Sequence, residues 1–182
     1  MNKTNLQNYI KTLDDNGSKI ELVDAIIGQF NGVGYEIVEV NTDKPWGAYL
    51  RINGDQADSF IEEFFPGLSP IEARLGVEGA ELSPKILIVS PGERLSWQYH
   101  DRRAERWVIL TEGSYNKSTT DEPGEPFAAQ PGDVVQFGKG ERHRLNGTNE
   151  SFVVVSEIWQ HTEQEYPSNE DDIVRLVDDY KR

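Results

Sequence analysis

The chain has 182 residues and a formal net charge of -14 at pH 7, a length that suits one domain with a sizeable core. The acidic balance argues against binding to nucleic acid or to anionic membrane surfaces, because phosphate backbones are bound by basic patches. A phosphorylated small molecule would therefore have to be bound by a local cluster of cations.

No run of about 18 apolar residues is present, and the first residues lack the apolar core of a signal peptide. The chain contains no cysteine, which removes any disulfide argument for secretion. We therefore predict a cytoplasmic protein without a membrane partner.

The N-terminal part predicts one helix followed by two strands. Residues 18–30 carry apolar side chains at the spacing of an amphipathic helix, with Ser18 as its N-cap. Residues 34–41 alternate in the manner of a strand, and residues 46–52 predict a second strand. We assign residues 1–33 as an N-terminal helical segment.

An insertion follows at residues 54–82. Within it, residues 57–65 predict a short helix that ends at Pro66 and Gly67. The pattern leaves three roles open for the insertion: a loop, a dimer element or a lid over a substrate.

From residue 84 to residue 160 every signal is that of a β-strand. Short apolar segments recur with Gly and Pro between them, at 85–89, 95–100, 105–110, 133–137, 143–146 and 151–159. Such spacing predicts an all-β sandwich or barrel. The last segment, 168–182, combines a capping Ser168 or Asn169 with early acids and an apolar stripe, which predicts a short C-terminal helix.

Four residues in the β region are candidate metal ligands. Gln98 and His100 lie two positions apart on an extended strand and must point to the same face. Glu105 follows closely, and His143 stands after a glycine-punctuated turn. This mixed N/O set suits a divalent ion; we expect zinc, with manganese, iron, cobalt or nickel as alternatives.

The two segments that contain these residues, 90–107 and 132–146, resemble the paired sequence motifs of the cupin superfamily, G-x5-H-x-H-x(3,4)-E-x6-G and G-x5-P-x-G-x2-H-x3-N. Aligned from Gly92, the motifs place Gln98 on the first His, His100 on the second, Glu105 on the acid and His143 on the last His. The resemblance implies a cupin double-stranded β-helix (jelly roll) in a single domain over residues 1–182, with short N-terminal and C-terminal helices, and these four residues as the ligands.

More narrowly, four segments are similar to type II mannose-6-phosphate isomerases. They are P-W-G at 45–47, P-G-E-R-L-S-W-Q-Y-H with R-A-E-R-W at 91–107, H-R-L-N at 143–146 and E-D-D-I-V-R at 170–175. The isomerase pattern has Gln at position 98, where cupins in general have His. Two positions depart from the patterns: Arg106 stands where the isomerases have His, and Gly138 stands where the second motif has Pro.

The resemblance implies an aldose-ketose isomerase acting on a sugar phosphate, mannose 6-phosphate and fructose 6-phosphate. Such a reaction needs an electrophile and a base that moves a proton between C1 and C2. We predict Arg175, Glu157 and Lys139 as catalytic residues, with Asp101 and Glu141 as further candidate bases. The residues predicted to bind the substrate are Lys85, Arg144 and Arg175, because Arg and Lys form charge-assisted bonds to phosphate.

Two other functions stay open. One is a non-enzymatic sugar-binding cupin, and the other is a different metal-dependent cupin enzyme: an epimerase, a lyase or a dioxygenase. Trp97, Trp107 and Trp159 are expected in the core, and His161 on the surface. By analogy with other cupins we expect a homodimer, formed through strand 85–89 or through the insertion.

Overall fold

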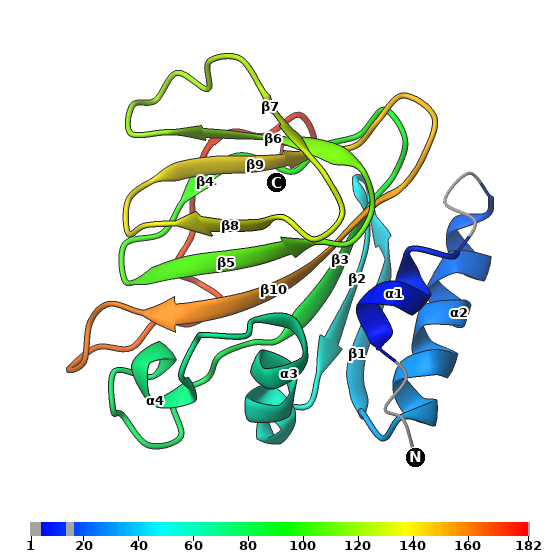
Figure 1. The fold of residues 1–182 in the computed structure, drawn as a ribbon. Helices are drawn as coiled ribbons and strands as arrows, with labels where there is room; N and C mark the ends of the chain where they lie inside the picture. Colours follow the sequence, from blue (N-terminus) through cyan, green and yellow to red (C-terminus); the bar gives the residue numbers. More distant parts are fainter. Residues whose placement is uncertain (1–4, 14–16, 182) are drawn as a thin grey trace.

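The computed structural model describes residues 5–13 and 17–181. Figure 1 shows two β-sheets, with the helices gathered along one side. The helical elements are α1 (Leu6–Ile10), α2 (Lys19–Gly32), the short 3-10 turn η1 (Gly54–Gln56), α3 (Ala57–Phe64) and α4 (Pro70–Ala73). The strands are β1 (Ile37–Lys44), β2 (Gly47–Ile52), β3 (Lys85–Val89), β4 (Trp97–Tyr99), β5 (Arg103–Ile109), β6 (Gly113–Ser118), β7 (Phe127–Ala129), β8 (Val134–Phe137), β9 (Arg142–Asn146), β10 (Val153–His161) and β11 (Val174–Val177).

The strands form two antiparallel sheets. The larger has the order β1-β2-β3-β10-β5-β8 and the smaller the order β11-β4-β9-β6-β7. Several neighbouring strands, such as β3 and β10 or β4 and β9, are distant in sequence, as the connectivity of a jelly roll requires. The predicted all-β cupin fold is therefore confirmed.

The space between the two sheets holds one of two hydrophobic clusters. Its members include Trp107 on β5, Phe137 on β8 and Leu145 on β9, all fully buried. Trp97 and Trp159 are also fully buried, so the three tryptophans lie in the core, as predicted. Because side chains alternate along a strand, the residues two positions from these apolar ones also point between the sheets.

The second cluster lies on the other face of the larger sheet, under the helices. Ile86 and Ile88 of β3 contribute from the sheet, and Phe30 of α2 and Phe60 of α3 from the helices. Helix α2 confirms the prediction for residues 18–30; Ser18 stands at its N-cap position without a side-chain hydrogen bond. The predicted N-terminal segment includes residues 1–4 and 14–16, which lie outside the described residues.

Strand β1 starts later than predicted. Gly34 has a φ of 95° and Tyr35 N donates to Phe30 O (2.9 Å), so these residues still belong to the turn that ends α2. The strand starts at Ile37, whereas β2 follows its prediction to within one residue.

The insertion is a structural layer. Ala57, Phe60, Ile61 and Phe64 of α3 are all buried in the cluster beneath the helices. The expected helix at 57–65 is confirmed. Its apolar face packs against the outer face of the larger sheet, so the main part of the insertion is neither a loose loop nor a lid.

The predicted C-terminal helix is wrong. Residues 174–177 form strand β11, which pairs antiparallel with β4 through Val174 opposite Tyr99 and Arg175 opposite Gln98. Val174 and Val177 have high β-propensity, and the free edge of β4 supplies backbone partners that outweigh the helical spacing of the apolar residues.

Strand β3 is also not available as a dimer edge. It pairs with β2 on one side and with β10 on the other, so its backbone groups are already used. The homodimer stays a prediction, but strand 85–89 cannot form it by edge pairing.

Candidate metal centre

Three of the predicted ligands meet between the sheets. Glu105 lies on β5 of the larger sheet, His143 on β9 of the smaller sheet, and His100 directly after β4. All three are at least 98% buried. One ligand atom of each lies within 4.8 Å of those of the other two, so the group can hold a metal ion.

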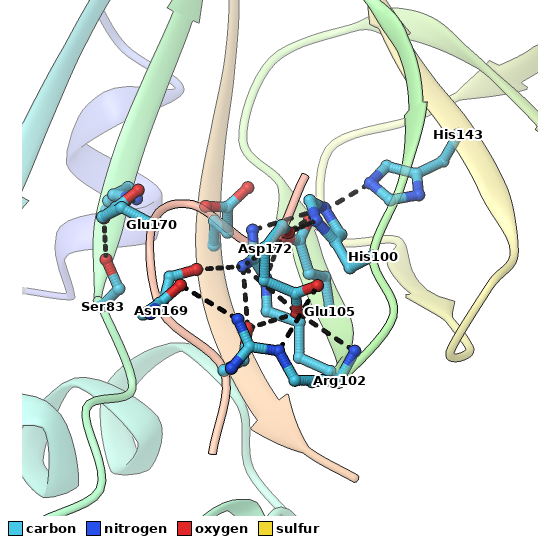
Figure 2. Close-up of polar contacts among 12 residues, drawn as sticks. Ser83, His100, Arg102, Glu105, His143, Asn169, Glu170 and Asp172 are labelled. Atoms are coloured by element: carbon cyan, nitrogen blue, oxygen red, sulfur yellow. Dashed lines mark hydrogen bonds and ion pairs between the residues drawn. The ribbon is translucent and has the colours of Figure 1, made fainter. Parts of the chain in front are cut away.

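The carboxylate of Glu105 lies between the two imidazoles. Its Oε1 is 3.0 Å from His100 Nε2, and its Oε2 is 3.3 Å from His143 Nε2. Figure 2 shows the three side chains close together. Both histidines therefore present their Nε2 atoms to the same small space.

Each histidine is fixed in the tautomer that a metal needs. His100 Nδ1 lies 2.5 Å from the carbonyl oxygen of Asp172, and His143 Nδ1 lies 2.9 Å from that of Glu141. A carbonyl only accepts, so Nδ1 carries the proton in both rings and Nε2 keeps its lone pair. Arg103 Nη2, which can only donate, lies 3.4 Å from His100 Nε2 and agrees with this assignment.

Two atoms at the centre of the group have no hydrogen-bond partner among the described residues. They are Glu105 Oε2 and His143 Nε2, both buried. An unpaired buried acceptor is costly, and a divalent cation would satisfy both at once. The residues present thus fit a metal of the zinc type.

The charge distribution also suits a cation. Burial by itself would raise the pKa of Glu105, but the adjacent His100 and Arg103 hold it well below its usual range. Burial lowers the pKa of His100, although the negative charge of Glu105 acts in the opposite direction. Glu105 is therefore a carboxylate and His100 a neutral imidazole, the protonation states that bind metals.

Gln98, the fourth predicted ligand, lines a pocket that adjoins the metal group and is described below. Its Cα is paired with that of His143 across β4 and β9. Its Oε1 accepts a hydrogen bond of 2.6 Å from Ser96 Oγ, and an amide oxygen has a second lone pair to offer. Ligation by Gln98 stays a prediction.

A pocket of about 500 Å³ opens beside the metal group. Its wall is rich in charged residues, including Glu105, Glu157, Lys85 and Arg175. Two sheets and the segment between β10 and β11 contribute to it. The pocket has the size and the convergent polar groups of a small-molecule site.

Glu157 of β10 is an acid of this pocket whose pKa is raised. Burial, followed by repulsion from Glu105, raises its pKa to about 7, although the charges of Lys85 and Arg103 act in the opposite direction. Trp107 Nε1 donates to its Oε2 at 3.1 Å. Both protonation states of this carboxyl group are thus accessible near neutral pH.

Two cations predicted for substrate binding lie in the pocket wall. Lys85 Nζ donates to Glu170 Oε1 at 2.7 Å and lies 4.8 Å from the centre of the Trp159 ring. Arg175 lines the pocket from β11 and has no ion pair within residues 5–13 and 17–181. Lys44, which the sequence analysis did not single out, also lines the pocket and has no ion pair in the same ranges.

Two other predicted residues do not reach the pocket. The ammonium group of Lys139 is half exposed and pairs with the carboxylate of Glu163 on the surface. Arg144 follows His143 on β9, so it points to the outer face of the smaller sheet, where its guanidinium lies 5.9 Å from the Trp97 ring. We therefore withdraw Lys139 as a catalytic residue and Arg144 as a substrate ligand.

The structure also corrects the prediction for His161 and shows that Arg103, which the sequence analysis did not single out, lies at the metal group. His161, expected on the surface, is 2% exposed: its Nε2 bonds Glu81 O at 2.6 Å and its Nδ1 accepts from Ser168 N at 3.0 Å. Arg103 is buried and donates from Nε to Glu105 Oε1 at 2.9 Å. Alternation along β5 could have indicated Arg103, because it precedes Glu105 by two positions and shares its face.

Comparisons with known proteins agree with this architecture. The family model described as mannose-6-phosphate isomerase C-terminal matches residues 76–178. The capsular polysaccharide assembling protein CapF from Staphylococcus aureus superposes with a TM-score of 0.53 at 11% identity, over 86% of this chain and 40% of that chain. A CapF structure with the inhibitor 3-isopropenyl-tropolone gives 0.53 at 13% identity, over 96% of this chain and 46% of that chain. No curated protein matches the chain.

The present chain thus spans less than half the length of the CapF chains, and the likeness to them concerns the fold alone. Two facing antiparallel sheets around a buried group of two histidines and a glutamate define a cupin. Since the matched segment covers more than half of the sequence, the chain belongs to the family of the mannose-6-phosphate isomerase C-terminal domain. Among the described residues, no helix is long and apolar enough to cross a membrane.

Proposed function

We propose that the protein is a metal-dependent aldose-ketose isomerase that interconverts mannose 6-phosphate and fructose 6-phosphate. The observation that carries the proposal is that the buried group of His100, Glu105 and His143 shares one pocket with Glu157, a carboxyl group whose pKa is raised to about 7. An isomerase needs both a carbonyl-polarising group and a base with such a pKa.

His100, Glu105 and His143 would hold the metal, and Gln98 would complete the set from the neighbouring strand. The ion would act as a Lewis acid toward the carbonyl oxygen of the sugar. Arg103 keeps Glu105 oriented through its hydrogen bond to Oε1, which leaves Oε2 directed at the metal position.

Glu157 is the proposed base. As a carboxylate it would remove the proton from C2 of the aldose, and as a carboxylic acid it would return that proton to C1, while the hydroxyl proton on O2 passes to O1, giving the ketose. A group with a pKa near 7 is present in both forms at neutral pH, which is the condition for such a two-way transfer. The bond from Trp107 Nε1 fixes one of its oxygens and leaves the other free to reach the sugar.

Arg175 and Lys44 are the proposed ligands of the phosphate group. Both line the pocket, and neither has an acidic partner in the described ranges. Lys85, by contrast, is tied to Glu170 at 2.7 Å. Lys85 is therefore better placed to tune Glu157, whose pKa its charge lowers, than to bind phosphate.

The polarity of the pocket favours this reading over a non-enzymatic sugar-binding cupin. Such a module would need apolar walls, with Lys85 and Arg175 turned outward. Both residues line the pocket instead, together with Glu105 and Glu157.

Metal content and turnover test the proposal together. We expect about one divalent ion per chain in the purified protein by elemental analysis, and turnover of mannose 6-phosphate in a coupled assay. His143→Ala should lose both. Lys139→Ala is the control, because Lys139 lies on the surface outside the metal group, and it should keep both.

Glu157→Gln separates the base from the metal. It should retain the ion while kcat falls by about 10²- to 10⁴-fold, the range of a general base. Bound metal without turnover of any sugar phosphate by the unmodified protein would refute the isomerase and leave another cupin reaction. Absence of metal after loading with zinc, manganese, iron, cobalt and nickel would refute the metal centre.

A further inference from the structure

The segment 168–177, which we call the strap, forms part of the pocket wall. It follows β10 and includes β11, which pairs with β4 of the smaller sheet. Glu170, Ile173 and Arg175 of the strap line the pocket. The shape of the substrate site thus depends on where the strap docks.

The carboxylate of Asp172 holds the strap in place. Oδ1 accepts from the backbone N–H of Asp101 at 2.9 Å, and Oδ2 accepts from that of Arg102 at 3.1 Å and from Ser168 Oγ at 2.6 Å. The side chain is 4% exposed. Figure 2 shows Asp172 between His100 and Arg102, at the turn that joins β4 to β5. One side chain therefore clamps the strap onto the backbone that directly follows His100.

The main chain of the same residue contacts the metal group. The carbonyl oxygen of Asp172 accepts from His100 Nδ1 at 2.5 Å and from Arg103 Nη1 at 3.2 Å. Arg103 also donates to Asn169 O of the strap and to Glu105 Oε1. The strap is thereby bonded to one ligand directly and to a second through Arg103.

We propose that Asp172 is a positioning residue that couples metal binding to the docking of the strap. Its carboxylate fixes the strap, and the fixed carbonyl holds His100 in the tautomer and orientation that present Nε2 to the metal. A metal on Nε2 makes Nδ1–H a stronger donor, so the ion stabilises the docked strap in return, as linkage requires. The proposal rests on ligation by His100 and does not require the isomerase reaction.

The test compares Asp172→Ala with two other variants. Asp172→Asn has almost the same shape and keeps one acceptor oxygen, so it should be affected less than the alanine variant. Asp171→Ala is the matched control: it removes the neighbouring acid of the same turn, whose side chain is exposed. Zinc affinity is measured by competition with a chromophoric chelator, and hydrogen exchange of strap peptides is followed by mass spectrometry with and without zinc.

In the unmodified protein and in Asp171→Ala, zinc should slow exchange in the strap. In Asp172→Ala the zinc affinity should fall by about 10- to 100-fold, as for other groups that orient a ligating histidine, and zinc should no longer protect the strap. The zinc affinity of Asp172→Asn should lie between those of the unmodified protein and Asp172→Ala. If circular dichroism shows that the alanine variant does not fold, the asparagine variant tests the proposal alone.

The proposal would be overturned if both Asp172 variants bind zinc with an affinity within about threefold of that of the unmodified protein. It would also be overturned if zinc still slows exchange in the strap of both variants. The coupling can be tested even if the protein binds zinc but turns over no sugar phosphate, because neither measurement depends on turnover. Failure of the coupling and failure of the isomerase proposal are therefore distinguishable.

Discussion

The raised pKa of Glu157 predicts a specific dependence of stability on pH. The pKa is raised from 4.5 to about 7, chiefly because the carboxyl group is buried. The folded protein thus favours the protonated form. The stability contributed by that form is fully present below pH 4.5 and is lost as the pH rises through 7.

The size of the effect follows from the shift. One pKa unit corresponds to about 1.4 kcal/mol, so the rise to about 7 corresponds to about 3 kcal/mol. The residue is 7% exposed, which leaves little solvent to screen the penalty. In the metal-free protein, ionised Glu157 should therefore lower the free energy of unfolding by about 3 kcal/mol above pH 7.

The assay is urea denaturation of the chelator-treated protein at pH 5 and pH 8. Glu157→Gln keeps the shape but cannot ionise, so its stability relative to the unmodified protein should be about 2–3 kcal/mol more favourable at pH 8 than at pH 5, where a small part of the penalty is already present. Glu125→Gln, an exposed glutamate, serves as the control and should show no such change. The difference between variants cancels the general effect of the chain's acidic charge. An equal difference at both pH values would refute the reasoning.

Three further predictions follow from the geometry. Arg175→Ala should lower kcat/KM for mannose 6-phosphate by about 10- to 100-fold, because one charge-assisted bond to the phosphate is lost. Lys139→Ala, on the surface, should change kcat/KM by less than about twofold. Equal effects of the two substitutions would contradict the assignment of the phosphate site. Phe60→Ala should lower the free energy of unfolding by about 3–5 kcal/mol in urea titrations, because Phe60 is fully buried between α3 and the larger sheet; a loss under about 1 kcal/mol would contradict that packing. Zinc at about 100 times its Kd should stabilise the protein by about 2.7 kcal/mol, and the same stabilisation in His143→Ala would exclude His143 as a ligand.

Much of the metal group was predictable from sequence. Strand alternation placed Gln98 and His100 on one face, and the motif resemblance added Glu105 and His143. The structure brings His100, Glu105 and His143 together, each buried. Local pattern was sufficient here because the candidate ligands lie on strands or directly after one, where alternation sets the side-chain direction and the motif spacing fixes the positions.

The C-terminal segment shows where local pattern fails. Ile173, Val174, Leu176 and Val177 have a spacing that fits a helix, yet residues 174–177 pair with β4. The decisive contacts are the backbone bonds to that strand edge and the three hydrogen bonds to the Asp172 carboxylate. Helical spacing is a weak preference in so short a segment, and tertiary pairing overrides it.

The roles of the cations could not be assigned from the sequence either. In the sequence, Lys85 and Arg175 both look available to bind a phosphate group. In the structure, Lys85 donates a hydrogen bond to Glu170, which is 85 positions away. Arg144 differs from His143 by one position, and that single step moves it to the opposite face of the sheet. Pairing between residues far apart in sequence leaves no local signal.

By itself, then, the sequence predicted the jelly roll, the three buried candidate ligands and the core position of the three tryptophans, through strand periodicity and through the resemblance to the cupin motifs. Only the tertiary structure decided the docking of the strap by Asp172, the inward position of Arg103 and the raised pKa of Glu157. The physical reason is that these depend on burial and on charges and hydrogen bonds brought together from distant strands, which no stretch of sequence contains.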